Sequence, residues 1–428
     1  MERGELLIGD DGRIAHVGAR GSAACPPGCE TLDLEGHVLL PGFCQAHVHL
    51  CQTLFRNQAD DLPLLPWLRE RIWPFEAAHD PASLAASAEL GIAELLRGGT
   101  TSVLDMGTVR HTEVLFEVAE RTGIRAVIGK CHMDVDSGQP RALFEQTHAS
   151  VAEAKALARR WHGAAGGRLH YGFAPRFVLS CTERLLREVA EAARAIGARL
   201  HTHASEQKPE CALVRERTGM DNIAYLHAIG FAGPDTVYAH GVQATDDEIA
   251  QMARSGTHLA HCPSSNLKLG SGIARIPAML EAGVNVAIGA DGAPCNNNLD
   301  ALLEARLAAL LHKPRYGADA LPAERVLAMA CRGGAAALGL EHEVGRLAPG
   351  MRADVISIDL RDPSNVPLAR PEAAIIYAAS SRQVRNVWVD GEPLLRDGEL
   401  VRLDAAEVAA RANEQWRAVC ARAETTSR

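Results

Sequence analysis

Two short motifs place histidines one residue apart: His47-Val48-His49 and His201-Thr202-His203. Side chains two residues apart on a β-strand point to the same face, so the imidazoles of either pair can share one metal ion. His240 and Asp291 also follow apolar runs, in Ala-His-Gly and Ala-Asp-Gly contexts. Neutral imidazoles with one carboxylate suit zinc, and less specifically iron or manganese. The residue types therefore predict a metal-dependent hydrolase.

The number of histidines weakens any single match. The chain has 18 of them, so one His-x-His motif by itself would mean little. The positions of the four features are more informative, because each feature follows a separate apolar run, near residues 38–49, 198–206, 236–242 and 285–293. A fold that brings the carboxyl ends of these runs together would concentrate the four features in one place.

Eight apolar, strand-like runs alternate with helix-like stretches through the middle of the chain. The runs lie near residues 38–49, 100–106, 125–134, 168–177, 198–206, 236–242, 258–266 and 285–293. The stretches 82–98, 111–123, 182–196 and 245–254 lie between them, each ending at or near a glycine. This alternation predicts an α/β fold, a (β/α)8 TIM-type barrel with its active site at the carboxyl ends of the strands. The alternative is an open doubly wound sheet, but no Gly-x-Gly-x-x-Gly follows the first strand.

Both ends of the chain have a different texture, with short strand-like runs separated by Gly and Asp turns. We expect residues 1–40 and 343–403 to form one small β-sandwich domain built from both termini. Residues 41–342 would then form the metal-dependent barrel, and residues 404–428 a C-terminal helix and tail.

Composition excludes several classes of protein. Of 428 residues, 47% are apolar and 23% charged, which is the globular average. The net charge of −9 offers no basic surface for nucleic acid or an anionic membrane. The first residues are polar, no apolar run is long enough for a membrane span, and the 11 cysteines include no Cys-x-x-Cys pair. We therefore expect a cytoplasmic protein with reduced cysteines.

The motifs together resemble the amidohydrolase superfamily. The resemblance rests on Pro41-Gly42-Phe43 before His47-Val48-His49, on His203 and Glu206, on His240 and on Asp291, and it runs nearly end to end. It implies one divalent metal per chain held by four ligands, and usually a homo-oligomer. The ligand types favour Zn2+, with Fe2+ and Mn2+ as the alternatives. The implied ligands are His47, His49, His203 and Asp291. Of His201 and His203 in the fifth run, the resemblance implies His203 as the ligand, because the family places its glutamate three residues after the ligand.

One absence favours the single-metal branch of that superfamily. Two-metal relatives bridge their ions with a carboxylated lysine on strand 4, and residues 168–177 contain no lysine. Within this branch the chain is similar to deaminases of nucleosides and heterocycles. Glu206 would then act as general acid/base, His240 would hold the attacking water, and Asp291 would both bind the metal and accept a proton.

The segment after strand 1 carries the clues to the substrate. Trp67 and Glu76 resemble the tryptophan and glutamate of S-adenosylhomocysteine and 5′-methylthioadenosine deaminases, where the glutamate binds the ribose hydroxyls. This favours an adenosine-type nucleoside, including 5′-deoxyadenosine. Taken alone, Trp67 is most simply a packing residue, and Glu76 could instead pair with Arg69 or Arg71.

Two other residues favour different substrates. Gln52 and Arg176 stand where guanine deaminases have a glutamine and an arginine that contact the purine, so a guanine or pterin deaminase is the first alternative. A triazine amino- or chlorohydrolase is the second. Chloride leaves without protonation, so the presence of Glu206 favours an amine as the leaving group. All these alternatives share a small-molecule substrate.

Overall fold

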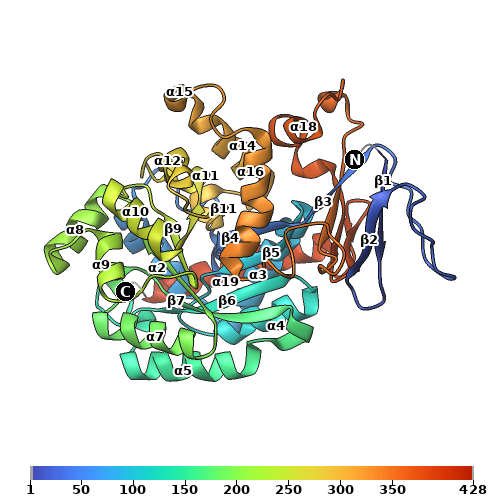
Figure 1. Cartoon of the computed structure of the whole chain (residues 1–428). Coiled ribbons are helices and arrows are strands. Elements are labelled where there is room, and N and C mark those ends of the chain that lie inside the picture. The colour runs from blue at the N-terminus through green and yellow to red at the C-terminus, as the bar shows by residue number, and fades with distance from the viewer. Residues whose placement is uncertain (1–2, 427–428) are drawn as a thin grey trace.

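The computed structural model describes residues 3–426, and its centre is an eight-stranded sheet of parallel strands (Figure 1). The neighbours in this sheet follow chain order from β4 to β11. A parallel bridge joins Val48 of its first strand to Asp291, in the turn just after its last strand, so the sheet closes into a barrel. The strands are β4 (Phe43–Val48), β5 (Thr100–Asp105), β6 (Arg125–His132), β7 (Leu169–Pro175), β8 (Arg199–Ala204), β9 (Thr236–His240), β10 (His258–His261) and β11 (Val286–Ile288). The predicted TIM-type barrel is confirmed.

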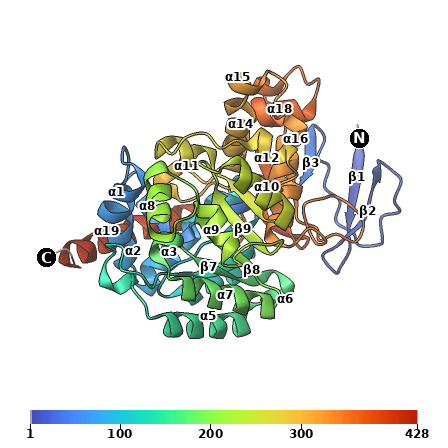
Figure 2. The same cartoon turned by 60° about the vertical axis from the view of Figure 1, so that its left-hand side comes forward.

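Helices follow the strands and cover the outside of the barrel (Figure 2). Local sequence explains where several begin: Asp80 and Ser83 form a capping box before α3, and Thr245 and Glu248 do so at α10. Left-handed glycines end others, such as Gly123 after α4. The larger helices are α3 (Pro81–Arg97), α4 (Thr112–Thr122), α5 (Thr147–Trp161), α7 (Glu183–Ala195), α8 (Lys208–Thr218), α9 (Asn222–Ala228), α10 (Asp246–Ser255), α14 (Ala301–Leu311) and α19 (Ala405–Thr426). Shorter ones are α11 (Pro263–Lys268), α12 (Ile276–Glu281), α16 (Ala323–Ala328), α17 (Gly334–Leu338) and α18 (Pro371–Tyr377).

Strands from the two ends of the chain meet beside the barrel. β1 (Gly4–Ile8) and β2 (Ile14–Ala19) form an antiparallel pair. A five-stranded antiparallel sheet has the order β15-β14-β13-β12-β3, with β3 (His37–Pro41) from the start of the chain and β12 (Val355–Asp359), β13 (Val384–Val389), β14 (Glu392–Arg396) and β15 (Glu399–Leu400) from its end. The two sheets share a small core that includes Ile14, Val355 and Trp388. The separate β-structure built from both termini is therefore present.

The passage from this sheet into the barrel takes one residue, Gly42. A Cβ atom at Gly42 would overlap the side chain of Thr101, so only glycine allows β4 to approach β5 this closely. β4 then ends at the residues that form the site.

Two further helical pieces complete the part of the barrel near the site. A continuous helical segment, residues 64–77, consists of α1 (Leu64–Trp67), a π-helical turn (Leu68–Ile72) and α2 (Trp73–Ala77). α19 packs along α3, and Trp416 contacts Phe75 of α2. Among the described residues, no helix combines the length and apolar character needed to cross a membrane.

Candidate active site

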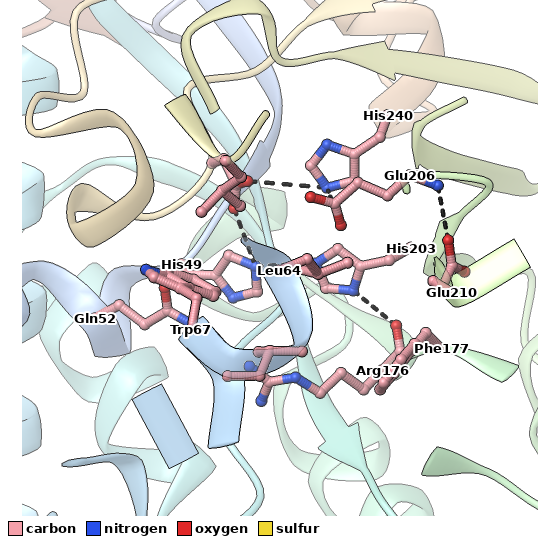
Figure 3. Close-up of a pocket in the computed structure, with 13 residues that line it drawn as sticks. His49, Gln52, Leu64, Trp67, Arg176, Phe177, His203, Glu206, Glu210 and His240 are labelled. Atoms are coloured by element: carbon pink, nitrogen blue, oxygen red, sulfur yellow. Dashed lines mark hydrogen bonds and ion pairs between the residues drawn. The ribbon is translucent and has the colours of Figure 1, made fainter. Parts of the chain in front are cut away.

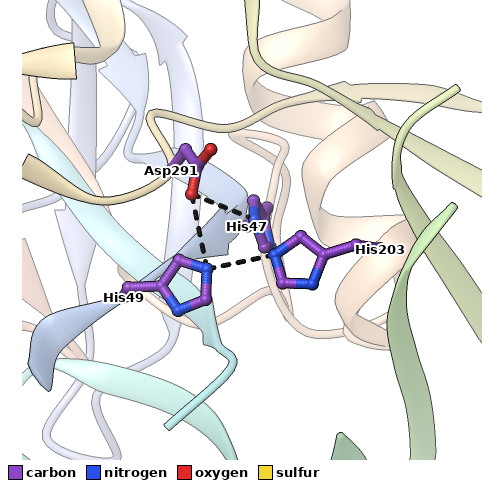
Figure 4. A group of neighbouring side chains, drawn as sticks. All are labelled: His47, His49, His203 and Asp291. Atoms are coloured by element: carbon purple, nitrogen blue, oxygen red, sulfur yellow. Dashed lines mark hydrogen bonds and ion pairs between the residues drawn. The ribbon is translucent and has the colours of Figure 1, made fainter. Parts of the chain in front are cut away.

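Four side chains from three places in the barrel wall meet at its centre (Figure 4). His47 and His49 come from the end of β4, His203 from β8, and Asp291 from the turn after β11. One nitrogen or oxygen of each lies within 4.8 Å of the others. Asp291 Oδ1 is 3.3 Å from Nε2 of both His47 and His49, and His49 Nε2 is 3.2 Å from His203 Nε2. These are the four ligands that the family resemblance implies.

The far sides of two imidazoles determine which nitrogen faces the cluster. His203 Nδ1 donates to the backbone carbonyl of Arg176 at 2.7 Å, so its Nε2 carries a lone pair. His47 Nδ1 lies 2.9 Å from His201 Nε2, and His47 Nε2 is buried with no hydrogen-bond partner. Convergent lone pairs without protons between them are what a cation requires, so the donor set fits one divalent metal ion.

The charges of the cluster suit the same group. Burial lowers the pKa of His49 and His203 well below the usual range, so both imidazoles are neutral. Burial by itself would raise the pKa of Asp291, but the neighbouring histidines hold it well below its usual value. Asp291 Oδ2 also accepts a hydrogen bond of 2.6 Å from Ser265 Oγ. Burial also lowers the pKa of His47, so three neutral imidazoles and one anionic carboxylate result.

Glu206 and His240 border the cluster on one side. His240 Nε2 lies 3.6 Å from Glu206 Oε2 and 3.8 Å from Asp291 Oδ2, and no hydrogen bond uses it. His240 Nδ1 pairs with Asn266 Oδ1 at 2.9 Å, which orients the ring. Both His240 (φ 75°) and Asp291 (φ 63°) have left-handed backbone, an unfavourable conformation that non-glycine residues often adopt at functional sites.

Burial raises the pKa of the Glu206 carboxyl to about 7. The carboxylate of Glu210 accepts the backbone N–H of Glu206 at 2.9 Å and so holds the chain at this point. A carboxyl that titrates near neutrality can both give and take a proton at the pH of the cell.

A cavity opens in front of these groups (Figure 3). Gln52 and Trp67 line it across from Glu206 and His240, and Arg176 and Phe177 line a third side. Leu64, Leu68 and Leu269 add apolar wall. Of the four predicted substrate-binding residues, Gln52, Trp67 and Arg176 therefore face the cavity, and Glu76 is not among its lining residues.

Glu76 lies behind this wall, in a buried ion pair. Arg176 donates from Nη1 to Glu76 Oε2 at 2.6 Å and from Nη2 to Oε1 at 3.2 Å. Gln52 Nε2 also donates to Glu76 Oε1, at 2.8 Å. The partner of Glu76 is thus neither Arg69 nor Arg71 but the arginine on the opposite side of the barrel mouth.

Sequence reasoning missed several residues that hold the site together. Ser265 and Asn266 position Asp291 and His240, and Glu210 fixes the backbone of Glu206. A signal for two of them was available, since Ser265 and Asn266 follow strand β10 at the same edge where the ligands lie. Glu210 carried no such signal, because it lies within helix α8.

Comparison with known proteins shows the family of the chain. The model of the amidohydrolase family matches residues 38–394, so the chain belongs to the amidohydrolase family. A 5-methylthioadenosine/S-adenosylhomocysteine deaminase of Moorella thermoacetica is 38% identical over 96% of this chain and 94% of its own length. A 5′-deoxyadenosine deaminase of Methanosarcina mazei is 37% identical over 95% and 91%, respectively.

A solved structure agrees closely with the fold. The crystal structure of an adenosine deaminase from Xanthomonas campestris with bound zinc superposes with a TM-score of 0.93 at 33% identity. The match covers 98% of this chain and 94% of that one. The whole architecture, barrel and flanking β-structure, is therefore shared with a known deaminase.

Proposed function

We propose that the protein is a metal-dependent hydrolytic deaminase of adenosine-type nucleosides, with 5′-methylthioadenosine, S-adenosylhomocysteine and 5′-deoxyadenosine as candidate substrates and ammonia as a product. The observation that carries this proposal is the meeting of the four-ligand cluster with Glu206 and His240 at the end of a buried cavity. The deaminases reported above support the substrate class, since they align over nearly the whole chain.

His47, His49, His203 and Asp291 would hold one divalent metal, with zinc favoured over Fe2+ or Mn2+ by the ligand types. Such an ion lowers the pKa of a bound water from about 15.7 towards 7 and so supplies a nucleophile at neutral pH. His240 Nε2, held by Asn266, would orient that water and stabilise the tetrahedral intermediate on the substrate. Asp291 would accept the proton of the water.

Glu206 would complete the reaction by proton transfer. Its carboxyl would donate to the ring nitrogen beside the attacked carbon, take up the proton of the added hydroxyl group and deliver that proton to the departing amine. The proton that Asp291 took from water would then return the Glu206 carboxyl to its starting state. The pKa near 7 that burial gives this group suits both directions of transfer. A departing chloride needs no proton, so the transfer to the leaving group is required for deamination alone.

One observation favours the guanine or pterin alternative. Arg176 and Gln52, whose types match those of guanine deaminases, both line the cavity. Arginine only donates hydrogen bonds, so it suits a carbonyl oxygen or an unprotonated ring nitrogen. A base with a carbonyl oxygen would satisfy Arg176 directly.

The test is ammonia release from a panel of substrates by protein stripped of metal and reloaded with zinc. The panel contains 5′-methylthioadenosine, S-adenosylhomocysteine, 5′-deoxyadenosine, adenosine, guanine and isoxanthopterin. We expect the highest kcat/KM with one of the adenosine nucleosides. Guanine or isoxanthopterin used more efficiently than every nucleoside would overturn the adenosine assignment.

We also propose a cytoplasmic location and a homo-oligomer. All eleven cysteines are free thiols, as expected in a reducing compartment. The domain division proposed above, with the cavity wholly within residues 41–342, assigns catalysis to the barrel alone.

A further inference from the structure

The wall of the cavity contains a group of three connected side chains, Gln52, Glu76 and Arg176, which we name the Glu76 cluster. Glu76 is its centre, because it accepts hydrogen bonds from both other members. All three are buried, and the Glu76 and Arg176 side chains are each only 4% exposed. The members come from the 3-10 helix Leu50–Phe55 that follows β4, from α2 and from the residue after β7, so only the folded barrel brings them together.

The carboxylate of Glu76 is already occupied. Each oxygen accepts from Arg176, and Oε1 accepts from Gln52 as well. An unpaired charge at this depth would be strongly unfavourable, so neither Glu76 nor Arg176 can leave the pair at low cost. Burial would lower the pKa of Arg176, but Glu76 raises it above the usual value, so the arginine stays charged. The pair is a fixed part of the wall.

The other two members do face the cavity, and Glu76 determines what they present. Gln52 uses its Nε2 on Glu76, which leaves its Oε1 as a buried acceptor with no partner. Arg176 has five N–H donors and uses two of them on Glu76. Gln52 Oε1 and the remaining N–H donors of Arg176 are therefore the polar groups of this wall that Glu76 leaves unused, while the negative charge of Glu76 is neutralised behind them.

The helical segment 64–77 explains why Trp67 reaches the cavity while Glu76 lies behind Arg176. Trp67 and Glu76 are nine residues apart, and in a regular α-helix this separation would place their side chains on opposite faces, about 180° apart. The π-helical turn Leu68–Ile72 inserts one residue and brings them to about 80° apart. Both side chains thus point into the barrel mouth, with Glu76 about two turns further along and against Arg176.

We propose that Glu76 is a positioning residue, which holds Arg176 and Gln52 for substrate recognition and makes no contact with a ribose diol. This inference rests on the proposed function, because it concerns recognition in the same cavity. The substrate class it defines is a nitrogen heterocycle with an acceptor atom facing Arg176 and an N–H or O–H group facing Gln52. The competing hypothesis is that Glu76 binds the two ribose hydroxyls.

A substrate pair separates the two hypotheses. Adenosine and 2′,3′-dideoxyadenosine differ only in the diol, so the ratio of their kcat/KM values measures what the diol contributes. In Glu76→Gln we expect kcat/KM to fall at least tenfold for both substrates, with the ratio within twofold of wild type. If Glu76 binds the diol, the ratio itself falls by roughly 10- to 150-fold, since a charge-assisted hydrogen bond is lost. That result would overturn the proposal.

Controls show whether the loss comes from positioning or from misfolding. Glu70→Gln changes an exposed glutamate in the same helical segment and should leave both rates unchanged. Metal content should stay at the wild-type value in Glu76→Gln. If this variant does not fold, the double variant Glu76→Met with Arg176→Leu, which removes both charges, replaces it in the same comparison. An unchanged substrate ratio in that variant supports positioning, and a collapsed ratio contradicts it.

The design also separates this inference from the proposed function. If wild type deaminates a free base such as guanine but no nucleoside, the adenosine assignment fails. Glu76→Gln should still lower turnover of that base at least tenfold, because a base has no diol to lose, and unchanged turnover would contradict positioning. If wild type releases ammonia from no substrate, the proposal of deamination is wrong. The role of Glu76 is then tested by the ratio of the dissociation constants of adenosine and 2′,3′-dideoxyadenosine, compared between wild type and Glu76→Gln.

Discussion

The two halves of the cavity are built in different ways. The reaction half, with His47, His203 and Asp291, stands at the ends of β-strands or in the turns just after them. The recognition half depends on the helical segment 64–77 and on a buried ion pair across the barrel mouth. In the first half the backbone of the barrel places each side chain. In the second, side chains place one another.

The difference has consequences for substitution. A strand-end ligand can be removed without moving its neighbours, since hydrogen bonds between strands hold the backbone. Removing one member of the Glu76 cluster leaves a buried charge or amide without its partner, so its effect spreads to the other two. Loss of a ligand should therefore act on metal and chemistry, and loss of a cluster member on recognition and stability together.

The largest expected effect tests the reaction half directly. Wild type should bind about one divalent ion per chain, and His47→Ala or Asp291→Ala should lose most of the metal and all measurable turnover. Elemental analysis beside an ammonia assay checks this. His261→Asn is the matched control, because His261 is a buried histidine on β10 outside the four ligands. Two tightly held ions per wild-type chain would contradict the single-metal site.

Next comes the proton shuttle. Glu206→Gln should keep the fold and the metal but lower kcat roughly 10²- to 10⁴-fold, the usual contribution of general acid/base catalysis. Glu248→Gln offers a comparison, since Glu248 on α10 is a buried glutamate that accepts the backbone N–H groups of Ile223 and Ala224 on α9. Near wild-type turnover of an amine substrate by Glu206→Gln would show that the proton follows another route.

A smaller effect is expected where the reaction half also depends on a side-chain contact. His201 Nε2 lies 2.9 Å from His47 Nδ1, and burial lowers the pKa of His201 well below its usual range, so the ring is neutral and can accept the Nδ1 proton. His201→Leu should weaken metal affinity about 10- to 100-fold, as loss of such partners does. His201→Gln, which keeps an acceptor, should recover part of it. Competition with a chelator measures both, and equal affinity in all three proteins would make His201 a packing residue only.

The smallest expected effect is the loss of unfolding free energy at acid pH, which tests the barrel that supports both halves. Burial lowers the pKa of His132 and of His261 to about 3. In the unfolded chain both imidazoles take up a proton near pH 6.5, whereas in the folded protein they stay neutral down to about pH 3. Their contribution to the free energy of unfolding is therefore complete above pH 6.5 and is lost as the pH falls towards 3. Each such histidine should cost about 1.4 kcal/mol of unfolding free energy per pH unit below 6.5. Urea titrations at several pH values between 7 and 5 give the unfolding free energy as a function of pH. This free energy should fall less steeply with decreasing pH in His261→Asn than in wild type, and an identical pH dependence would contradict the buried neutral state.

Much of the reaction half could be predicted from the sequence. The residue period of a strand placed His47 and His49 on one face, and the alternation of strands with helices predicted that their carboxyl ends share one edge. The ambiguity between His201 and His203 was resolved by family resemblance. In the structure His203 faces the cluster, while His201 lies behind His47.

What the sequence by itself determined was the barrel and the set of reactive residues, because both follow from local periodicity and from the types of side chain. Only the tertiary structure decided how Glu76 is used. Gln52, Glu76 and Arg176 lie up to 124 positions apart, and an ion pair of 2.6 Å depends on the exact approach of helix α2 to the residue after β7. Period and propensity describe neighbours along the chain, whereas a contact across the barrel mouth depends on how the whole wall packs.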